Sequence, residues 1–204
     1  MKGAVQQPTI VLLFTSDSSL ARDAGTERVF VEMANEFVAR GYPVIAITND
    51  AQDVEPFYKL DKRVRFIGSG LHTFMLPPVV KLKREVNRII HFSEFPQQLY
   101  RAKLVAAKVR PLLAGISVKA LVCYEHESIL VANRLQLHNV PIVSMQHNAI
   151  KVTLGRMDKY ALQEENKATV TQVLMPGFVA EAQKYVQTRI VYIPNVVEPV
   201  PPEY

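Results

Sequence analysis

Residues 9–48 read TIVLLFTSDSSLARDAGTERVFVEMANEFVARGYPVIAIT, and this stretch decides the fold. Residues 9–14 and 44–48 are short apolar runs, which is typical of strands that are buried on both faces. The apolar residues between the runs recur near the helical repeat and predict a helix with one buried side: Val29, Phe30, Met33, Phe37 and Val38. We expect the helix to end at Arg40-Gly41, where a glycine suits a left-handed backbone.

The predicted helix begins at Gly25, after a polar loop over residues 15–24. In such a strand–loop–helix unit, the free backbone N–H groups and the positive end of the helix dipole face the space above the first strand. We therefore expect Gly25 and Thr26 to present N–H groups to an anion, usually a phosphate. The sequence has neither the three-glycine dinucleotide fingerprint after this strand nor a Walker-type phosphate loop, which disfavours ordinary NAD and ATP binding.

The rest of the chain alternates strands with helices. Further strands are predicted at residues 63–67, 119–124, 141–145, 170–174 and 189–192. Helices are predicted at residues 79–91, 95–113, 129–137, 155–167 and 177–186. Six or seven strands separated by helices indicate an α/β fold, a doubly wound, Rossmann-like parallel sheet with helices on both faces. Ligands bind beyond the carboxyl ends of such strands, which selects the loop before Gly25 and residues 68–72, 125–128 and 146–148.

The composition fits one globular domain. Its 204 residues are 49% hydrophobic and 21% charged, with a net charge of +5. No apolar run approaches the ~20 residues of a membrane-spanning helix, and the first residues lack the apolar core of a signal peptide, so we expect a cytoplasmic protein. Cys123 is the only cysteine, which excludes an internal disulfide and a thiolate metal cluster. Because metal-binding and hydrolase motifs are also absent from the sequence, we expect no metal and no cofactor.

Two histidines, His126 and His147, come directly after predicted strands. They fall at the carboxyl edge of the sheet, where each either binds a ligand or hydrogen-bonds a loop carbonyl. Glu125 and Glu127 flank His126, and paired carboxylates suggest acid–base chemistry. On an extended segment, however, alternate side chains point to opposite sides, so we expect these two carboxylates at a solvated loop rim.

The sequence resembles the N-terminal domain of the retaining glycosyltransferases of family 4. Gly25-Thr26-Glu27-Arg28 and the segments 33–37 and 40–48 are similar to that family's opening unit, with Ala24 in place of its first glycine. Residues 120–128, 140–148 and 189–197 resemble later strands of the family in the same order, and 193–195 reproduce its Ile-Pro-Asn signature. The resemblance implies one half of a GT-B fold.

This resemblance implies that a second domain binds one of the two substrates. Residues 1–195 would form the acceptor-side domain, and the proline-rich residues 196–204 would begin an interdomain linker. The missing donor-binding domain, in cis or in trans, would hold a nucleotide-sugar donor. The full enzyme would transfer a sugar, with retention, to a glycan or lipid-linked acceptor, and this chain alone would be inactive. Two alternatives remain open: a non-catalytic binding module, and half of another GT-B-like enzyme such as an epimerase or phosphorylase.

The family resemblance also assigns roles to single residues. It implies that His126 is the catalytic histidine, which lies near the transferred sugar and the acceptor. Glu127, which directly follows it, His147, Gly25 and Thr26 would bind substrate.

A basic stretch at residues 79–110 suggests a further partner. Its cations include Lys81, Lys83, Arg84 and Arg88, and apolar residues are interleaved with them. Such a stretch suits an anionic membrane surface at the inner leaflet, where many members of the family act on lipid-linked acceptors. The alternative is a pair of core-packed helices with a basic outer face. Nucleic acid is disfavoured because the net charge is modest and aromatic and basic residues do not alternate.

Overall fold

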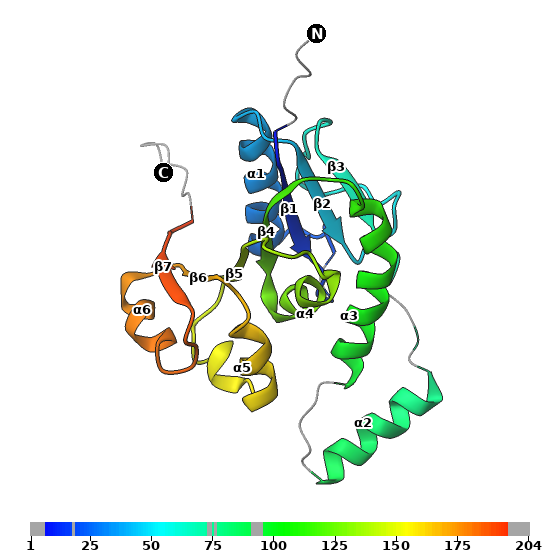
Figure 1. Ribbon diagram of the computed structural model, residues 1–204, viewed down its shortest axis with the longest axis vertical. Helices are drawn as coiled ribbons and strands as arrows, with labels where there is room; N and C mark the ends of the chain where they lie inside the picture. Colours follow the sequence, from blue (N-terminus) through cyan, green and yellow to red (C-terminus); the bar gives the residue numbers. More distant parts are fainter. Residues whose placement is uncertain (1–6, 18, 73–74, 76, 91–95, 196–204) are drawn as a thin grey trace.

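The computed structural model describes residues 7–17, 19–72, 75, 77–90 and 96–195, and of residues 87–90 and 96 only the backbone. One seven-stranded, all-parallel sheet has the order β3-β2-β1-β4-β5-β6-β7, which confirms the predicted doubly wound α/β fold (Figure 1). The strands are β1 Thr9–Phe14, β2 Val44–Thr48, β3 Arg65–Gly68, β4 Val118–Tyr124, β5 Ile142–Gln146, β6 Val170–Val173 and β7 Arg189–Tyr192. The helices are α1 Gly25–Ala39, α2 Pro78–Ile90, α3 Pro96–Val109, α4 Glu125–Leu135, α5 Lys159–Glu165 and α6 Pro176–Ala182, with 3₁₀ turns η1 Arg110–Leu113 and η2 Leu154–Arg156.

The two faces of the sheet carry separate hydrophobic cores. Successive side chains of a strand point to opposite faces, and β1 is buried along its whole length. Ile10, Leu12 and Phe14 pack with α1 in one core. Val11 and Leu13 pack with α3 and α4 in the other. The continuous apolar runs of the sequence follow from this double burial.

The direction of winding reverses between β1 and β4, which are neighbours in the middle of the sheet. From β1 the chain crosses through α1 to β2, and from β4 it crosses through α4 to β5 on the other side. Helices α1 and α4 therefore begin at adjacent strand ends but lie on opposite faces of the sheet. Open α/β sheets bind their ligands at such a switch point.

Several predicted helix boundaries differ from those of the structure. Helix α4 begins at Glu125, not at residue 129, because the left-handed backbone of Glu125 (φ 64°) turns the chain from β4 directly into the helix. The predicted loop over residues 125–128 is therefore the first turn of α4. The predicted helix 155–167 is divided into η2 and α5, and Asp158 caps the new start by accepting hydrogen bonds from two backbone N–H groups of α5. The predicted helix 95–113 changes to the η1 turn after Val109.

Buried polar groups tie the loops at the carboxyl edge together. The amide of Asn49, which follows β2, donates to the carbonyls of Thr15 and Ser16 and accepts from the Ser69 hydroxyl after β3. The backbone N–H of Thr15 donates to Ser128 Oγ of α4 at 3.0 Å. The ends of β1, β2, β3 and β4 are thus held in one arrangement, which fixes the base of the candidate site.

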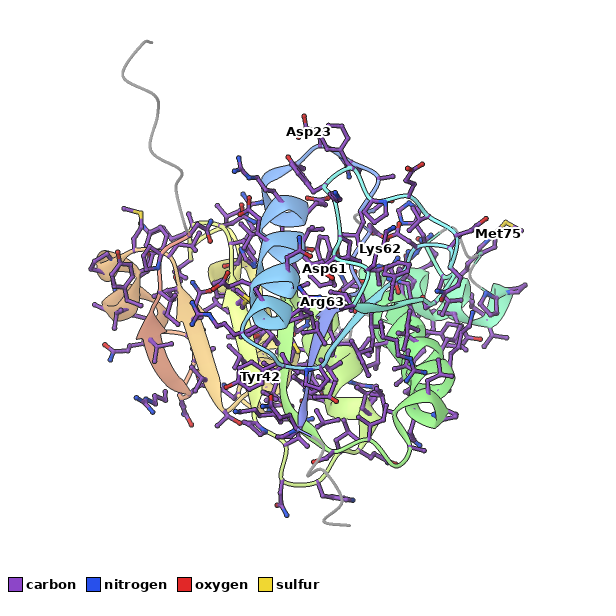
Figure 2. The ribbon with its side chains drawn as sticks, turned by 90° about the horizontal axis from the view of Figure 1, so that it is seen from above. Asp23, Tyr42, Asp61, Lys62, Arg63 and Met75 are labelled. Carbon is purple, nitrogen blue, oxygen red and sulfur yellow. The ribbon has the colours of Figure 1, made fainter. Side chains whose placement is uncertain are left out.

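The loop between β2 and β3 runs along α1. Figure 2 shows Asp23 beyond one end of α1 and Asp61 beside the helix. The amide of Asn35 donates to the Lys59 carbonyl at 2.9 Å and accepts from the Asp61 N–H at 2.7 Å, and the Tyr58 hydroxyl donates to Asp23. These contacts fix the loop that leads into Gly25.

Helix α2 differs from the other helices because little of its apolar surface is buried. In Figure 1 it stands away from the sheet, at the end toward which the β1 and β2 arrows point. Val79, Leu82 and Val86 are 76%, 65% and 43% exposed and lie three and four residues apart, on one side of the helix. No helix within the described residues is long and apolar enough to cross a membrane.

Candidate functional site

The start of α1 leaves backbone donors without a side-chain cap. Ala24 precedes the helix in an extended conformation, and its methyl group cannot accept a hydrogen bond. A Cβ atom at Gly25 would meet no atom within 4 Å. The fold therefore does not require glycine at this position. Gly25 and Thr26 lie where the sequence places them, at a helix start beside the switch point.

The carboxyl groups of Glu27 and Glu125 lie near the start of α1, close enough for their charges to interact. Glu27, in the first turn of α1, is buried, and its Oε1 has no hydrogen-bond partner among the described residues. Glu125, on α4, accepts a hydrogen bond from the Ser16 hydroxyl in the loop before α1. Burial raises the pKa of Glu125, the Ser16 hydrogen bond opposes the rise, and the charges of Glu27 and Asp17 add to it. Glu125 is thus a carboxyl group at the switch point that ionises less readily than usual.

Glu127 belongs to a buried ion cluster. The guanidinium of Arg101, from α3, lies between the carboxylates of Asp17 and Glu127, and its side chain is only 4% exposed. Burial disfavours the charge on Arg101, but the two carboxylates more than offset this and raise its pKa. The predicted solvated rim is therefore wrong for Glu127. Its carboxylate holds α4 against α3 and the β1–α1 loop.

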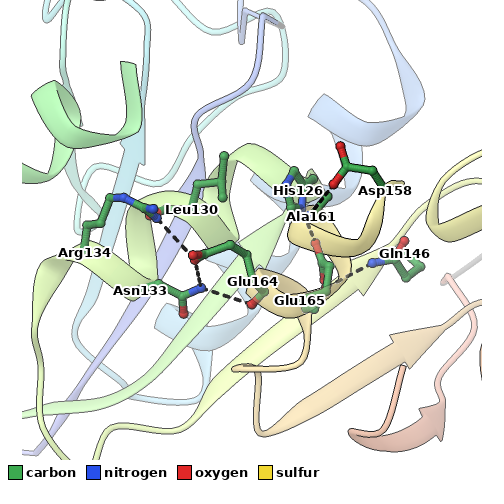
Figure 3. A network of polar contacts seen from close by, with 10 residues as sticks. His126, Leu130, Asn133, Arg134, Gln146, Asp158, Ala161, Glu164 and Glu165 are labelled. Atoms are coloured by element: carbon green, nitrogen blue, oxygen red, sulfur yellow. Dashed lines mark hydrogen bonds and ion pairs between the residues drawn. The ribbon is translucent and has the colours of Figure 1, made fainter. Parts of the chain in front are cut away.

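His126 is oriented by a buried chain of polar groups (Figure 3). Its Nδ1 lies 2.8 Å from Oε1 of Glu165, the last residue of α5, which is fully buried. The Ser144 hydroxyl of β5 donates to Oε2 of Glu165 at 2.8 Å, and the Gln146 amide donates to Ser144 Oγ at 3.0 Å. Three elements of the fold, α4, α5 and β5, thus set the orientation of one imidazole ring.

The His126 ring also lines a pocket of about 180 Å³ between α3, α4 and α5. Leu99, Leu130 and Ala161 contribute apolar walls. At the far end, Glu164 accepts hydrogen bonds from the Asn133 amide at 2.8 Å and from Arg134 at 3.3 Å (Figure 3). The charged groups at that end therefore satisfy one another, whereas His126 is the titratable group at the other end.

His147 lies on the α1 side of the sheet, apart from His126. Its ring stacks on Tyr124, with centroids 4.8 Å apart and an interplanar angle of 10°, and Tyr124 belongs to the core beneath α1. Burial lowers the pKa of His147 to about 4, so the ring is neutral at physiological pH. Neither ring nitrogen has a hydrogen-bond partner in the part of the chain that the structure describes. A neutral, half-buried imidazole whose nitrogens lack partners among the described residues suits a ligand that offers or accepts a hydrogen bond.

The predicted site residues thus fall into groups around one sheet edge. Gly25 and Thr26 lie with Glu125, His147 lies over Tyr124, and His126 turns toward α5. The membrane-contact candidates Lys81, Lys83 and Arg84 are exposed on α2, apart from these groups, and the Arg88 side chain lies outside the described residues. Within the described residues, no three His, Cys, Asp or Glu side chains are placed to hold a metal ion.

Arg101 and Glu165 are functional-site residues that the sequence analysis did not identify. Both are charged residues on predicted helices, where charge usually marks the solvated face. Their partners are 26 and 39 residues away in the chain, so no local spacing pairs them. A charge on the otherwise small and apolar stripe of α3, Ala102, Val105, Ala106 and Val109, is the only hint that Arg101 points inward.

Comparisons with known proteins support the fold. No family model matches the sequence, and no curated protein sequence does. Sucrose-phosphate synthase from Thermosynechococcus elongatus is similar in structure, with a TM-score of 0.66 and 16% identity over 92% of this chain and 48% of its own. Arabidopsis thaliana UGT89C1 in complex with UDP-L-rhamnose has a TM-score of 0.56 and 11% identity, over 95% of this chain and 50% of its own. MurG from Acinetobacter baumannii has a TM-score of 0.51 and 14% identity, over 94% of this chain and 46% of its own. This chain therefore has the Rossmann-like fold of a GT-B domain and spans about half of each of these proteins.

Proposed function

We propose that the chain is the acceptor-side domain of a GT-B glycosyltransferase that uses a nucleotide-sugar donor. The observation that carries the proposal is the carboxyl edge of the sheet around the switch point between β1 and β4. An uncapped helix start lies there, the oriented His126 lies on the α4 side, and His147, whose ring nitrogens have no partner among the described residues, lies on the α1 side. The likeness in fold to sucrose-phosphate synthase, and to UGT89C1 with its bound UDP-L-rhamnose, supports the proposal.

Each group has a distinct part in this proposal. The N–H groups of Gly25 and Thr26 face a phosphate or the reacting sugar's surroundings. His126 hydrogen-bonds the acceptor or the transferred sugar and orients it, since oriented reactants lose less entropy on reaching the transition state. His147, held neutral, hydrogen-bonds a hydroxyl group of the substrate. Glu127 acts indirectly, because its carboxylate is engaged with Arg101.

The complete reaction needs a second domain. Transfer requires both substrates within reacting distance and water excluded, which takes two walls of a cleft. We propose that residues 1–195 supply one wall and that a donor-binding domain, in cis or in trans, supplies the other. As in the family 4 enzymes that the sequence resembles, the product would keep the configuration of the donor, and the acceptor would be a glycan or a lipid-linked glycan.

Selective binding by this chain tests the proposal. Calorimetry with UDP-, GDP- and TDP-sugars should show no binding tighter than roughly millimolar, about 4 kcal/mol, because the donor is held by the other domain. Glycan or lipid-linked acceptors should bind more tightly than these donors, and His147→Ala should weaken acceptor binding. Micromolar donor binding would reject the acceptor-side role. Acceptor binding without any transfer once a donor domain is supplied would favour a non-catalytic binding module.

We also propose that α2 places the domain peripherally on the cytoplasmic face of an anionic membrane. The exposed apolar side of α2, formed by Val79, Leu82 and Val86, adjoins the cations Lys81, Lys83 and Arg84. An amphipathic helix of this kind binds an anionic interface by inserting its apolar face while its cations meet the headgroups. Because α2 lies at the carboxyl-end side of the sheet, this contact would bring a lipid-linked acceptor toward the candidate site.

A further inference from the structure

We propose that Glu165 is a positioning residue, which fixes a proton on Nδ1 of His126 so that Nε2 accepts a hydrogen bond from a substrate hydroxyl group. The inference rests on the proposed function, since it assigns a ligand class to the histidine of that site. Glu165 is not among the residues that the sequence analysis selected. The ligand group that His126 would recognise is a hydroxyl donor, not a phosphate or carbonyl oxygen.

The direction of the hydrogen bonds around Glu165 follows from its neighbours. The Gln146 Nε2 group can only donate, so Ser144 Oγ accepts its hydrogen bond at 3.0 Å. The Ser144 hydroxyl proton is then directed to Oε2 of Glu165, 2.8 Å away. A carboxylate is an acceptor only, and this arrangement therefore treats Glu165 as a carboxylate.

Burial then decides which nitrogen of His126 carries the proton. A fully buried carboxylate is costly unless donors satisfy both of its oxygens. Ser144 satisfies Oε2, and the His126 Nδ1, 2.8 Å from Oε1, is the donor to the other oxygen. Nδ1 must therefore be protonated, and a neutral ring in this tautomer has its lone pair on Nε2. Histidine tautomers are set in this way by the bond that the other ring nitrogen makes.

The same geometry selects the ligand. Because Nδ1 is occupied by Glu165, we assign the ligand contact to Nε2, and the His126 ring lines the pocket beside Leu99 and Leu130. A neutral Nε2 lone pair accepts from an O–H group and repels phosphate and carbonyl oxygens, which are acceptors themselves. Sugar hydroxyl groups are donors of this kind.

The tautomer can be measured on this chain without any activity. In ¹⁵N-labelled protein at neutral pH, we expect long-range ¹H–¹⁵N spectra to show a protonated Nδ1 and an unprotonated Nε2 for His126. In Glu165→Gln the amide can donate or accept, so the single tautomer should be replaced by a mixture. Glu164→Gln is the matched control, because the neighbouring carboxylate bonds Asn133 and Arg134 and not His126, and it should keep the wild-type tautomer.

Two spectroscopic results would overturn the inference: an Nε2–H tautomer or an imidazolium ring in the wild-type chain, or an unchanged tautomer in Glu165→Gln. The wild-type spectrum alone shows which nitrogen of His126 carries the proton, so the inference is tested even if the Glu165→Gln variant fails to fold. It therefore also separates the positioning role from a purely structural one.

A kinetic comparison separates this inference from the proposed function. With a donor-binding domain supplied, Glu165→Gln should lower kcat by about tenfold or more, as when the partner of a functional histidine is removed, with a smaller change in KM. Equal kcat for Glu165→Gln and wild type would reject the inference and leave the transferase intact. The expected tautomer without turnover from any donor domain would support the Glu165–His126 assignment and reject the proposed function.

Discussion

Glu125 carries backbone strain at the point where β4 passes into α4. Its φ of 64° lies in the left-handed region, which costs a residue with a side chain roughly 1–2 kcal/mol. The same residue is half-buried, near the charges of Glu27 and Asp17. Strained residues of this kind cluster at functional sites, because the surrounding structure must hold them in place. In this fold, the strain allows α4 to begin at the switch point without an intervening loop.

The charge of Glu125 should cost stability at neutral pH. Burial raises the pKa of its carboxyl in the folded state above the usual value of 4.5. As the pH rises through 4.5 the unfolded state therefore ionises first, and the folded state loses stability from that pH upward. Gln cannot ionise and still accepts the Ser16 hydrogen bond. We predict a higher Tm for Glu125→Gln than for wild type at pH 7 and equal Tm values well below pH 4.5. Thermal melts across this range check it, with the exposed Glu55→Gln as control. A lower Tm for Glu125→Gln at pH 7 would mean that the carboxylate stabilises the fold.

Gly68 and Gly25 should respond differently to alanine. A Cβ at Gly68 would lie 2.5 Å from the Ala51 carbonyl oxygen, whereas one at Gly25 meets nothing within 4 Å. We predict that Gly68→Ala lowers the free energy of unfolding by about 1–3 kcal/mol, as overpacking does, and that Gly25→Ala changes it by less than about 1 kcal/mol. Urea denaturation of both variants measures this. Equal losses would show that Gly25 is needed by the fold and not by a ligand.

At the scale of elements, the sequence predicts strands better than helix starts. The bounds of β1, β2 and β7 agree with the predicted ranges, because buried parallel strands are short apolar runs between polar turns. Helix α4 begins with Glu125-His126-Glu127-Ser128, a polar segment typical of a loop, and its left-handed first residue has no sequence signature. Helix α5 is separated from η2 by the Asp158 cap within a mostly polar segment. The start of α5 is thus set by a local cap, whereas the start of α4 depends on a backbone conformation that the sequence does not mark.

Only some of the cations in the basic stretch of residues 79–110 are available to a membrane. Arg101 is buried in its ion cluster, Lys108 donates to the Ser69 carbonyl and Arg110 donates to the Arg134 carbonyl, so these cations serve the fold. Lys81, Lys83 and Arg84 of α2 are exposed to solvent beside its apolar side. We therefore place the proposed membrane contact on α2.

Vesicle binding should depend on the cations of α2. We predict that the chain sediments with vesicles of anionic lipid and is released by salt. Lys81, Lys83, Arg84 and Arg88 changed together to Glu should weaken binding on the order of a thousandfold, since each cation contributes about 1 kcal/mol. Changing the exposed Lys62, Lys151, Lys184 and Arg189 to Glu alters the net charge equally and is the matched control. Equal binding to neutral vesicles, or equal losses in both variants, would contradict a contact through α2.

At the scale of the molecule, the sequence predicts the fold and the sheet edge that carries the site. It does not predict which polar side chains contact one another there. Strand–helix alternation predicts the parallel sheet, and the sheet predicts that Gly25, His126 and His147 share its carboxyl edge. That α1 and α4 lie on opposite faces depends on the strand order, which separates the two histidines. The partners Arg101 and Glu165 come from distant helices, and long-range pairing of buried charges leaves no local pattern.

The most direct test of the central claim is turnover by residues 1–204 with and without a donor-binding domain. We predict no transfer from nucleotide sugars by the chain alone, because one domain provides one wall of the cleft. Adding the second domain, covalently or in trans, should restore transfer, and His126→Ala should then lower kcat by more than it weakens acceptor binding. Transfer by residues 1–204 unaided would contradict the claim that this chain is the acceptor-side half of the enzyme.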